Sequence, residues 1–220
     1  MRISGAIFDL DGTLLHTLPI VIAAFRKALF STTGRWFGNQ EIMSLFGPTE
    51  AGILRRAVPE RWPEALAIYT QEYKDLFVSQ QIGPFPGLRD ALQLLRRHHI
   101  PTAIVTGKSA SSTAFSLEKA GLQDHFDLVL TGSADGPVKP DLIRKVLEVW
   151  SIRPAQGFYL GDSPSDLGDA RQVGVIPLGA AWADGACFGE LDSLRPEATF
   201  KTVGAFIQWI ADRVDDPGST

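Results

Sequence analysis

The stretch Ile7-Phe8-Asp9-Leu10-Asp11-Gly12-Thr13-Leu14 decides how the rest of the sequence is interpreted. The apolar run at residues 5–8 stops at two carboxylates spaced one residue apart, and a glycine follows them. A short apolar run bounded by a turn signal is typical of a buried strand in a parallel sheet. We therefore expect both acids at the carboxyl edge of that strand, where open α/β sheets bind their ligands.

Asp9 and Asp11 are close enough in the sequence to repel each other, and a fold that tolerates such a pair has to compensate for the repulsion. A divalent cation or a shared proton is the usual compensation. An aspartate can also act as a nucleophile in phosphoryl transfer, while a second carboxylic acid protonates the leaving oxygen. A solvated turn with two surface acids is the bland alternative. These residues alone leave both interpretations open.

Composition sets the class of protein. The chain has 220 residues, of which 45% are hydrophobic and 21% charged, enough to bury a core in one large domain or in a core with a smaller module. The net charge of −4 argues against a nucleic-acid partner. The single cysteine, Cys187, excludes an internal disulfide and a cysteine-based zinc site. The sequence has the form of neither a signal peptide nor a membrane span, so we expect a cytoplasmic protein.

An all-helical block follows the first strand. Helical patterns occupy residues 20–30, 39–46, 49–58 and 62–79, and Thr17 is the expected N-cap of the first. No strand pattern appears in this block, and the turn-rich linker 83–87 ends it. The sequence thus predicts a small helical domain at 16–83, inserted into a core formed by 1–15 and 84–220.

Strand and helix patterns alternate after the linker, which predicts an α/β fold with a doubly wound parallel sheet. The tail at 215–220 is expected to fray. The expected strands lie at 100–105, 126–130, 158–160 and 173–178, and the expected helices at 88–98, 109–120, 141–150, 166–172 and 203–214.

Three further polar motifs follow predicted strands or precede a predicted helix. Thr106-Gly107 ends a strand, where a hydroxyl and a free amide suit a phosphate oxygen. Lys139-Pro140 precedes an amphipathic helix and offers a point positive charge. Gly161-Asp162 ends a later strand, and Asp166 follows four residues after Asp162. Taken singly, each has an ordinary interpretation as a capping turn, an exposed lysine or a polar turn.

The string Gly107-Lys108-Ser109 matches only the end of a nucleotide-binding P-loop. The first glycine of that motif would fall at position 102, which is Thr102. The nucleotide interpretation is therefore rejected.

Taken together, the four motifs resemble those of the haloacid dehalogenase-like (HAD) hydrolases, in the same order and each in the expected context. The helical insert at 16–83 is similar in position and size to the cap of the phosphoglycolate phosphatase and β-phosphoglucomutase-like branch. The resemblance implies a Rossmann-like core and a Mg²⁺-dependent phosphatase that works through an aspartyl phosphate.

The resemblance also implies a role for each motif residue. Asp9 would be the nucleophile and Asp11 the general acid and base. Asp9, the backbone carbonyl of Asp11 and Asp162 would bind Mg²⁺. The remaining motif residues would support the metal site, in the case of Asp166, or bind phosphate, in the case of Thr106, Gly107 and Lys139.

Substrate specificity is expected in the helical insert. The candidates are Gly47 and Thr49 in one loop and the nearby Arg55 and Arg56, although both arginines lie off the apolar stripe of their helix and a solvated face is an equal alternative. His16, at the hinge of the insert, either lines the entrance or closes a turn.

The resemblance implies a small phosphorylated metabolite as the substrate, such as a phosphoglycolate-type ester or a sugar phosphate. We expect a monomer or a homodimer that binds neither nucleic acid nor a membrane. A β-phosphoglucomutase-type mutase and a pyrophosphatase are the alternatives within the family. Dehalogenase chemistry is disfavoured because such enzymes normally lack the acid at position 11. A phosphoacceptor switch or a binding protein is a distant alternative.

Overall fold

A six-stranded parallel sheet forms the centre of the computed structural model, which describes residues 2–184, 186 and 188–214. Cys187 and the tail at 215–220, which was expected to fray, lie outside these residues. The strand order is β3-β2-β1-β4-β5-β6. The strands are β1 (Gly5–Phe8), β2 (Thr102–Val105), β3 (Leu128–Leu130), β4 (Gly157–Gly161), β5 (Ile176–Ala180) and β6 (Ala198–Phe200).

β1 lies between β2 and β4, so the direction of winding reverses at the centre of the sheet. Such a switch point opens a crevice at the carboxyl ends of the strands, which is where doubly wound sheets bind ligands. The predicted α/β class is confirmed.

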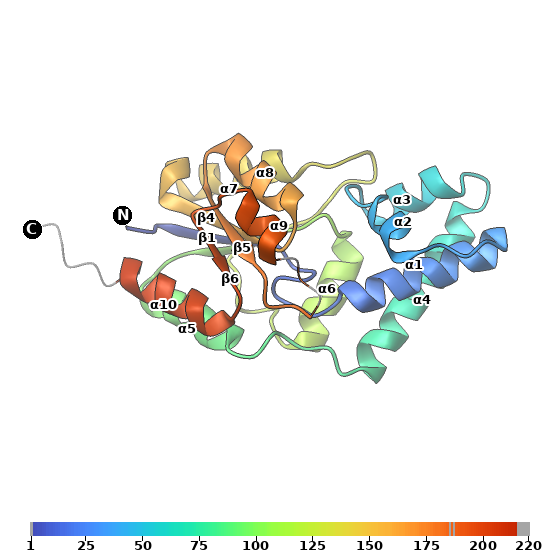
Figure 1. Ribbon diagram of the computed structural model, residues 1–220, viewed down its shortest axis with the longest axis horizontal. Coiled ribbons are helices and arrows are strands. Elements are labelled where there is room, and N and C mark those ends of the chain that lie inside the picture. Colours follow the sequence, from blue (N-terminus) through green and yellow to red (C-terminus); the bar gives the residue numbers. More distant parts are fainter. Residues whose placement is uncertain (1, 185, 187, 215–220) are drawn as a thin grey trace, which may run out of the picture.

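Alternate residues of the strands pack on opposite faces of the sheet, as the period-2 geometry of a strand requires. Phe8 and Phe158 face one hydrophobic cluster, whereas Ile7 and Tyr159 face the other. Figure 1 shows the resulting layers, with helices on both faces of the sheet. The first cluster is covered by α5 (Leu88–Arg97), α6 (Ala110–Ala120) and α10 (Val203–Val214), and the second by α7 (Lys139–Trp150) and α8 (Pro164–Val173).

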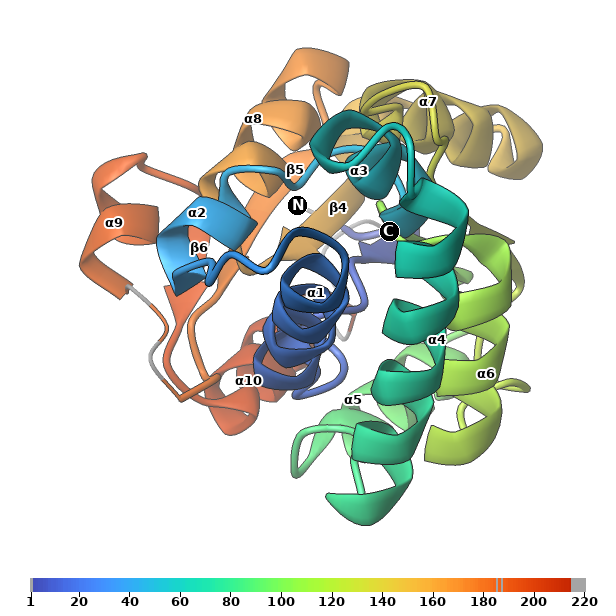
Figure 2. The ribbon, with the colours of Figure 1, turned by 90° about the vertical axis from the view of Figure 1, so that its right-hand side faces the viewer.

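Four helices between β1 and α5 form a second body, here called the helical lobe: α1 (Leu18–Thr33), α2 (Asn39–Met43), α3 (Glu50–Ala57) and α4 (Trp62–Ser79). Phe25 of α1 packs on Tyr69 of α4 with ring centroids 4.4 Å apart. Figure 2 looks onto the lobe, with α1 and α4 in front of the sheet.

The loop between β3 and α7 reaches across to the helical lobe (Figure 1). The Thr49 amide donates to the Ser133 carbonyl at 2.9 Å, and Arg56 Nη2 donates to the Asp135 carbonyl at 3.0 Å. A Cβ atom at Gly52 would lie 2.2 Å from the Ala134 carbonyl oxygen, so the absence of a side chain there permits this close packing. The loop therefore holds α3 against the core.

Several predicted boundaries differ from the structure. α7 begins at Lys139 and not at 141, because Pro140 is accepted in the first turn of a helix. The strand expected from 173 begins at Ile176, since α8 continues to Val173 and ends at Gly174, whose φ is 86°. Two short elements, α9 (Phe188–Ser193) and β6, and the 3₁₀ turn η1 (Pro154–Gln156) were not predicted. Among the described residues, no helix is both long and apolar enough to cross a membrane.

Candidate active site

Three carboxylates meet at the carboxyl edge of the two central strands. Asp9 follows β1 directly, and its amide continues the sheet by donating to the Leu160 carbonyl of β4 at 2.9 Å. Asp162 follows β4, and Asp166 lies in the first turn of α8. Carboxylate oxygens of Asp9, Asp162 and Asp166 lie within 4.8 Å of one another. The structure thus brings together three of the predicted site residues in a group able to hold a metal ion.

Gly12 makes the approach of Asp162 possible. Its φ is 79°, in the left-handed region, and a Cβ atom there would lie 2.2 Å from Asp162 Oδ2. Thr13, the next residue, directs its hydroxyl to Asp162 Oδ1 at 3.3 Å. The turn after β1 therefore both admits and orients the Asp162 carboxylate.

Lys139 connects two of the acids, because it begins α7 next to this edge. Its Nζ atom lies 2.6 Å from Asp166 Oδ1 and 3.2 Å from Asp9 Oδ1. Asp166 also accepts hydrogen bonds from the Tyr159 hydroxyl at 3.2 Å, and from the Ser163 amide at 3.1 Å and hydroxyl at 2.6 Å. The Asp166 carboxylate is thus committed to holding Lys139 and the start of α8.

Burial and nearby negative charges act on Asp9 and Asp162. Burial raises the pKa of Asp9 to about 7; the nearby Asp166 and Asp11 also raise it, against the lowering effect of Lys139. Burial, Asp166 and Asp9 raise the pKa of Asp162 well above its usual value. Although burial acts in the opposite direction, Lys139 lowers the pKa of Asp166.

These observations fit a bound cation. Asp9 Oδ1 is buried and accepts no hydrogen bond, although Lys139 lies nearby. A divalent ion between Asp9 and Asp162 would offset the burial and the neighbouring negative charges that raise both pKa values, and hard oxygen ligands of this kind suit Mg²⁺ or a similar metal.

The Asp11 side chain turns away from the metal cluster toward Lys108. Lys108 Nζ lies 3.2 Å and 3.3 Å from the two Asp11 oxygens, and the Thr17 hydroxyl donates to Asp11 Oδ1. Thr17 is the N-cap residue of α1, as predicted, but its side chain makes no cap hydrogen bond, because its hydroxyl binds the Asp11 carboxylate instead. The negative charges of Asp9 and Asp11 are therefore compensated by two different lysines, Lys139 and Lys108.

Sequence reasoning missed Lys108. It lies two residues beyond Thr106, at the predicted site edge, but it was set aside together with the rejected P-loop. Its side chain is only 2% exposed. Although burial lowers the pKa of Lys108, Asp11 and other neighbours outweigh burial and hold it well above its usual value. The signal available in the sequence was a lysine two residues beyond the Thr106 strand end.

The helical lobe covers this edge through the start of α3. Glu50 Oε2 accepts from the Ser109 amide at 3.0 Å, and Glu50 Oε1 lies 3.9 Å from Lys108 Nζ. The Gly47 carbonyl oxygen lies 3.5 Å from the position that a Cβ atom would take at Gly107. Glu50, which the sequence did not single out, is thus the lobe residue that contacts the core beside Asp11.

The structure separates the residues predicted to determine specificity into two groups. Gly47 and the buried Thr49 lie where the lobe meets the core. Arg55 instead stacks on Trp62 at 4.5 Å, and the exposed Arg56 binds the loop after β3, so the structure brings neither arginine to Asp9.

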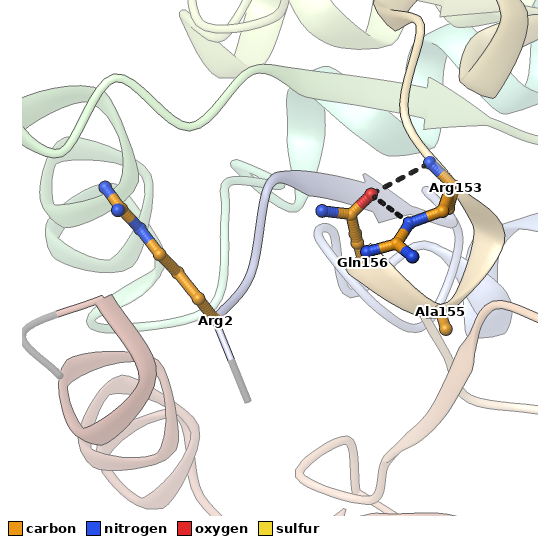
Figure 3. A pocket seen from close by; sticks show the side chains of 4 residues that line it. All are labelled: Arg2, Arg153, Ala155 and Gln156. Carbon is orange, nitrogen blue, oxygen red and sulfur yellow. Dashed lines mark hydrogen bonds between the residues drawn. The ribbon is translucent and has the colours of Figure 1, made fainter. Parts of the chain in front are cut away.

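His16 remains at the hinge, edge-on to Phe85 with centroids 5.5 Å apart. A hollow opens there, lined by His16, Gly83, Pro84, Phe85, Pro86, Trp182 and Asp184. A second hollow lies at the opposite end of the sheet, before β1 and β4 (Figure 3). Its Arg153 and Gln156 bond to each other while Arg2 is directed away from them, so no set of polar groups converges there.

Comparison with known proteins agrees with this geometry. The family model described as haloacid dehalogenase-like hydrolase matches residues 6–180, which include every motif residue from Asp9 to Asp166. The chain belongs to the haloacid dehalogenase-like hydrolases. The resemblance drawn from the four motifs is confirmed.

Relatives within the family carry two different activities in their names. The chain is 30% identical to a phosphoglycolate phosphatase of Thiobacillus denitrificans, over 81% of this chain and 85% of that protein. It is 25% identical to the pyrophosphatase PpaX of Halalkalibacterium halodurans, over 80% of this chain and 82% of that protein. A haloacid dehalogenase-like hydrolase structure from Streptococcus pneumoniae, 24% identical, superposes with a TM-score of 0.74 over 94% of this chain and 98% of that one.

Proposed function

We propose that this HAD-family phosphatase is Mg²⁺-dependent and hydrolyses a small phosphate monoester, with Asp9 as the nucleophile. The observation that carries the proposal is the grouping of Asp9 with Asp162 and Lys139 at the carboxyl edge, where the buried Asp9 Oδ1 atom accepts no hydrogen bond. The phosphoglycolate phosphatases and pyrophosphatases among its relatives support a phosphatase.

In the first half-reaction, an oxygen of Asp9 forms a bond to phosphorus while the bond from phosphorus to the alcohol oxygen breaks. Asp11 gives its proton to the leaving alcohol. In the second, the Asp11 carboxylate takes a proton from a water molecule, whose oxygen attacks phosphorus. Inorganic phosphate leaves and the Asp9 carboxylate is restored.

The remaining motif residues would stabilise charge on the phosphoryl group. Lys139, fixed by Asp166, would neutralise one phosphoryl oxygen, and the Thr106 hydroxyl and the Gly107 amide would bind the others. Mg²⁺, held by the carboxylates of Asp9 and Asp162 and by the Asp11 carbonyl, would supply further positive charge.

The helical lobe would act as a cap, with the domain boundaries at 16–83 that the sequence suggested. Its contacts through Glu50 to Ser109 and through Thr49 to the loop after β3 close the site on one side. A closed cap excludes water during the first half-reaction and has to open for the alcohol to leave.

The test is a phosphate-release assay with Mg²⁺ across a panel of phosphate monoesters and pyrophosphate, comparing the parent chain with Asp9→Asn. We expect turnover to be abolished in the variant while its circular dichroism spectrum is unchanged. Asp141→Asn, at an exposed ion pair with Arg144, is the matched control and should retain full activity. Substantial activity in Asp9→Asn would contradict the proposal. Release of phosphate without an added bisphosphate separates a phosphatase from a mutase.

A further inference from the structure

Two buried polar atoms beside Asp11 have no hydrogen-bond partner. They are Glu50 Oε1, on a residue only 5% exposed, and the hydroxyl of Tyr69, which is fully buried. Both belong to the helical lobe. Because buried polar groups are nearly always paired, these two atoms call for a polar partner from outside the chain, either a water molecule or a ligand.

Lys108 joins these atoms to Asp11. An ammonium has three N–H donors, and Asp11 accepts from Lys108 Nζ through both of its oxygens. Glu50 Oε1 lies 3.9 Å from the same Nζ atom, which is too far for a hydrogen bond. The Lys108 ammonium therefore lies beside both the Asp11 carboxyl group and a Glu50 oxygen that accepts no hydrogen bond.

Two aromatic rings from α4 form the wall of this position. Tyr73 lies under the ammonium, with Lys108 Nζ 4.2 Å from its ring centroid, and its hydroxyl is already paired with Ser116 at 2.8 Å. Tyr69, one helical turn earlier, stacks on Tyr73 with centroids 6.0 Å apart and an interplanar angle of 10°. The stacked pair of rings therefore carries one hydroxyl that is paired, on Tyr73, and one that is unpaired, on Tyr69.

The charges at this position disfavour an anion. Asp11 carries its proton while the ester is bound, so the Glu50 carboxylate offsets the Lys108 ammonium and no net positive charge remains. The other lobe cations whose contacts are described are directed elsewhere, to Trp36, Glu72, Glu41, Trp62, Asp135, Glu64 and Phe115. A carboxylate or a second phosphate placed here would be buried without a net positive charge to compensate it.

A hydroxyl group fits where an anion does not, because it can donate and accept at once. We infer that Glu50, Tyr69 and Lys108 bind a hydroxyl group on the leaving alcohol, next to the ester oxygen that Asp11 protonates. The substrate is then a phosphate ester of a polyol or sugar, and not of a hydroxy acid, nor pyrophosphate. This inference rests on the proposed function, since it takes Asp11 as the residue beside the leaving group.

The test compares three esters that differ at one carbon: 2-hydroxyethyl phosphate, phosphoglycolate and ethyl phosphate. The first two have the same length and differ by a hydroxymethyl or a carboxylate group. We expect kcat/KM for 2-hydroxyethyl phosphate to exceed that for each of the other two by about tenfold to a hundredfold. A ratio of this size is expected when one buried polar group is left without its hydrogen bond.

Two variants assign the preference to these residues. Glu50→Gln removes the negative charge, so it should reduce the ratio of kcat/KM between 2-hydroxyethyl phosphate and phosphoglycolate at least tenfold. Tyr69→Phe removes only the hydroxyl and should reduce the ratio between 2-hydroxyethyl phosphate and ethyl phosphate. Glu72→Gln is the control and should change neither ratio. Glu72 lies on the same helix as Tyr69 and forms an ion pair with the exposed Lys27 of α1.

A preference for phosphoglycolate or pyrophosphate, or a Glu50→Gln variant with unchanged ratios, would overturn the inference. Calorimetric titration of each ester with the Mg²⁺-loaded protein keeps the two proposals separate. If no ester releases phosphate, the proposed function fails, and the ratio of Kd values for 2-hydroxyethyl phosphate and phosphoglycolate still decides the inference.

Discussion

The ammonium of Lys139 lies 2.6 Å from Oδ1 of Asp166. The same nitrogen lies 3.2 Å from Asp9, so Asp166 fixes the lysine beside the proposed nucleophile without occupying the phosphoryl position. Asp166 is almost completely buried, and its second oxygen accepts from Ser163. This arrangement makes Asp166 a positioning residue for Lys139.

Asp166→Asn should lower both stability and turnover. Breaking one partner of a buried ion pair costs about 3–5 kcal/mol in the free energy of unfolding. Freed from Asp166, Lys139 would move closer to Asp9, and kcat should fall about a hundredfold, as when one charge-stabilising donor is lost. Urea unfolding and phosphate release measure the two effects. Asp141→Asn, in an exposed pair, should change the free energy of unfolding by less than about 1 kcal/mol. Equal effects of the two variants would show that Asp166 has no special role.

Gly12→Ala should inactivate the enzyme by displacing Asp162. The φ of 79° strains any residue with a Cβ atom, and that atom would lie 2.2 Å from the Asp162 carboxylate. We expect phosphate release to fall at least tenfold, with a higher Mg²⁺ concentration needed for half-maximal rate. Gly168→Ala in α8 is the matched control. No heavy atom lies within 4 Å of its added Cβ, so the change should stabilise the helix by up to about 1 kcal/mol and spare activity.

The metal-free protein should lose stability as pH rises from about 4 to 7. The folded-state pKa of Asp9 is raised to about 7 from 3.8, so in this range the folded chain binds a proton that the unfolded chain has released. Each pKa unit is worth about 1.4 kcal/mol, which gives a loss of up to about 4 kcal/mol from this group. Urea unfolding with a chelator at pH 4 and pH 8 measures it. In Asp9→Asn the slope should be clearly smaller; an identical slope would show that Asp9 is not its source.

The sequence predicted the parts of the site that lie next to strand ends. Asp9, Thr106 and Asp162 each follow an apolar run directly, and parallel strands bring their carboxyl ends to one edge whatever the loops do. Lys139 also lies beside this edge, although its helix begins two residues earlier than expected. For residues at strand ends, the local pattern of apolar and polar residues is sufficient to predict their position in the fold.

The sequence could not predict contacts between the lobe and the core. Glu50 and Lys108 are 58 positions apart, and Tyr69 lies on a third element, so nothing in the spacing of these residues relates them. Arg55 and Arg56 attracted attention as cations, but the rotation of α3 on its axis directs them to Trp62 and to the loop after β3. That rotation depends on close packing at Gly52 against the Ala134 carbonyl, which is a tertiary property.

Mg²⁺ should stabilise the protein most where the acids repel each other most. At pH 8 the ion relieves the repulsion between Asp9 and Asp162, so saturating Mg²⁺ should raise the Tm by several degrees, as expected for a gain of about 2–3 kcal/mol. At pH 5, where the Asp9 pKa of about 7 leaves that acid mostly protonated, the shift should be smaller. Asp162→Asn should reduce the shift at pH 8, because one ligand and one negative charge are lost together. Asp141→Asn should keep the parent shift, since its pair with Arg144 is exposed. Differential scanning fluorimetry with Mg²⁺ or a chelator measures all three, and a shift in Asp162→Asn equal to that of the parent chain would place the ion elsewhere.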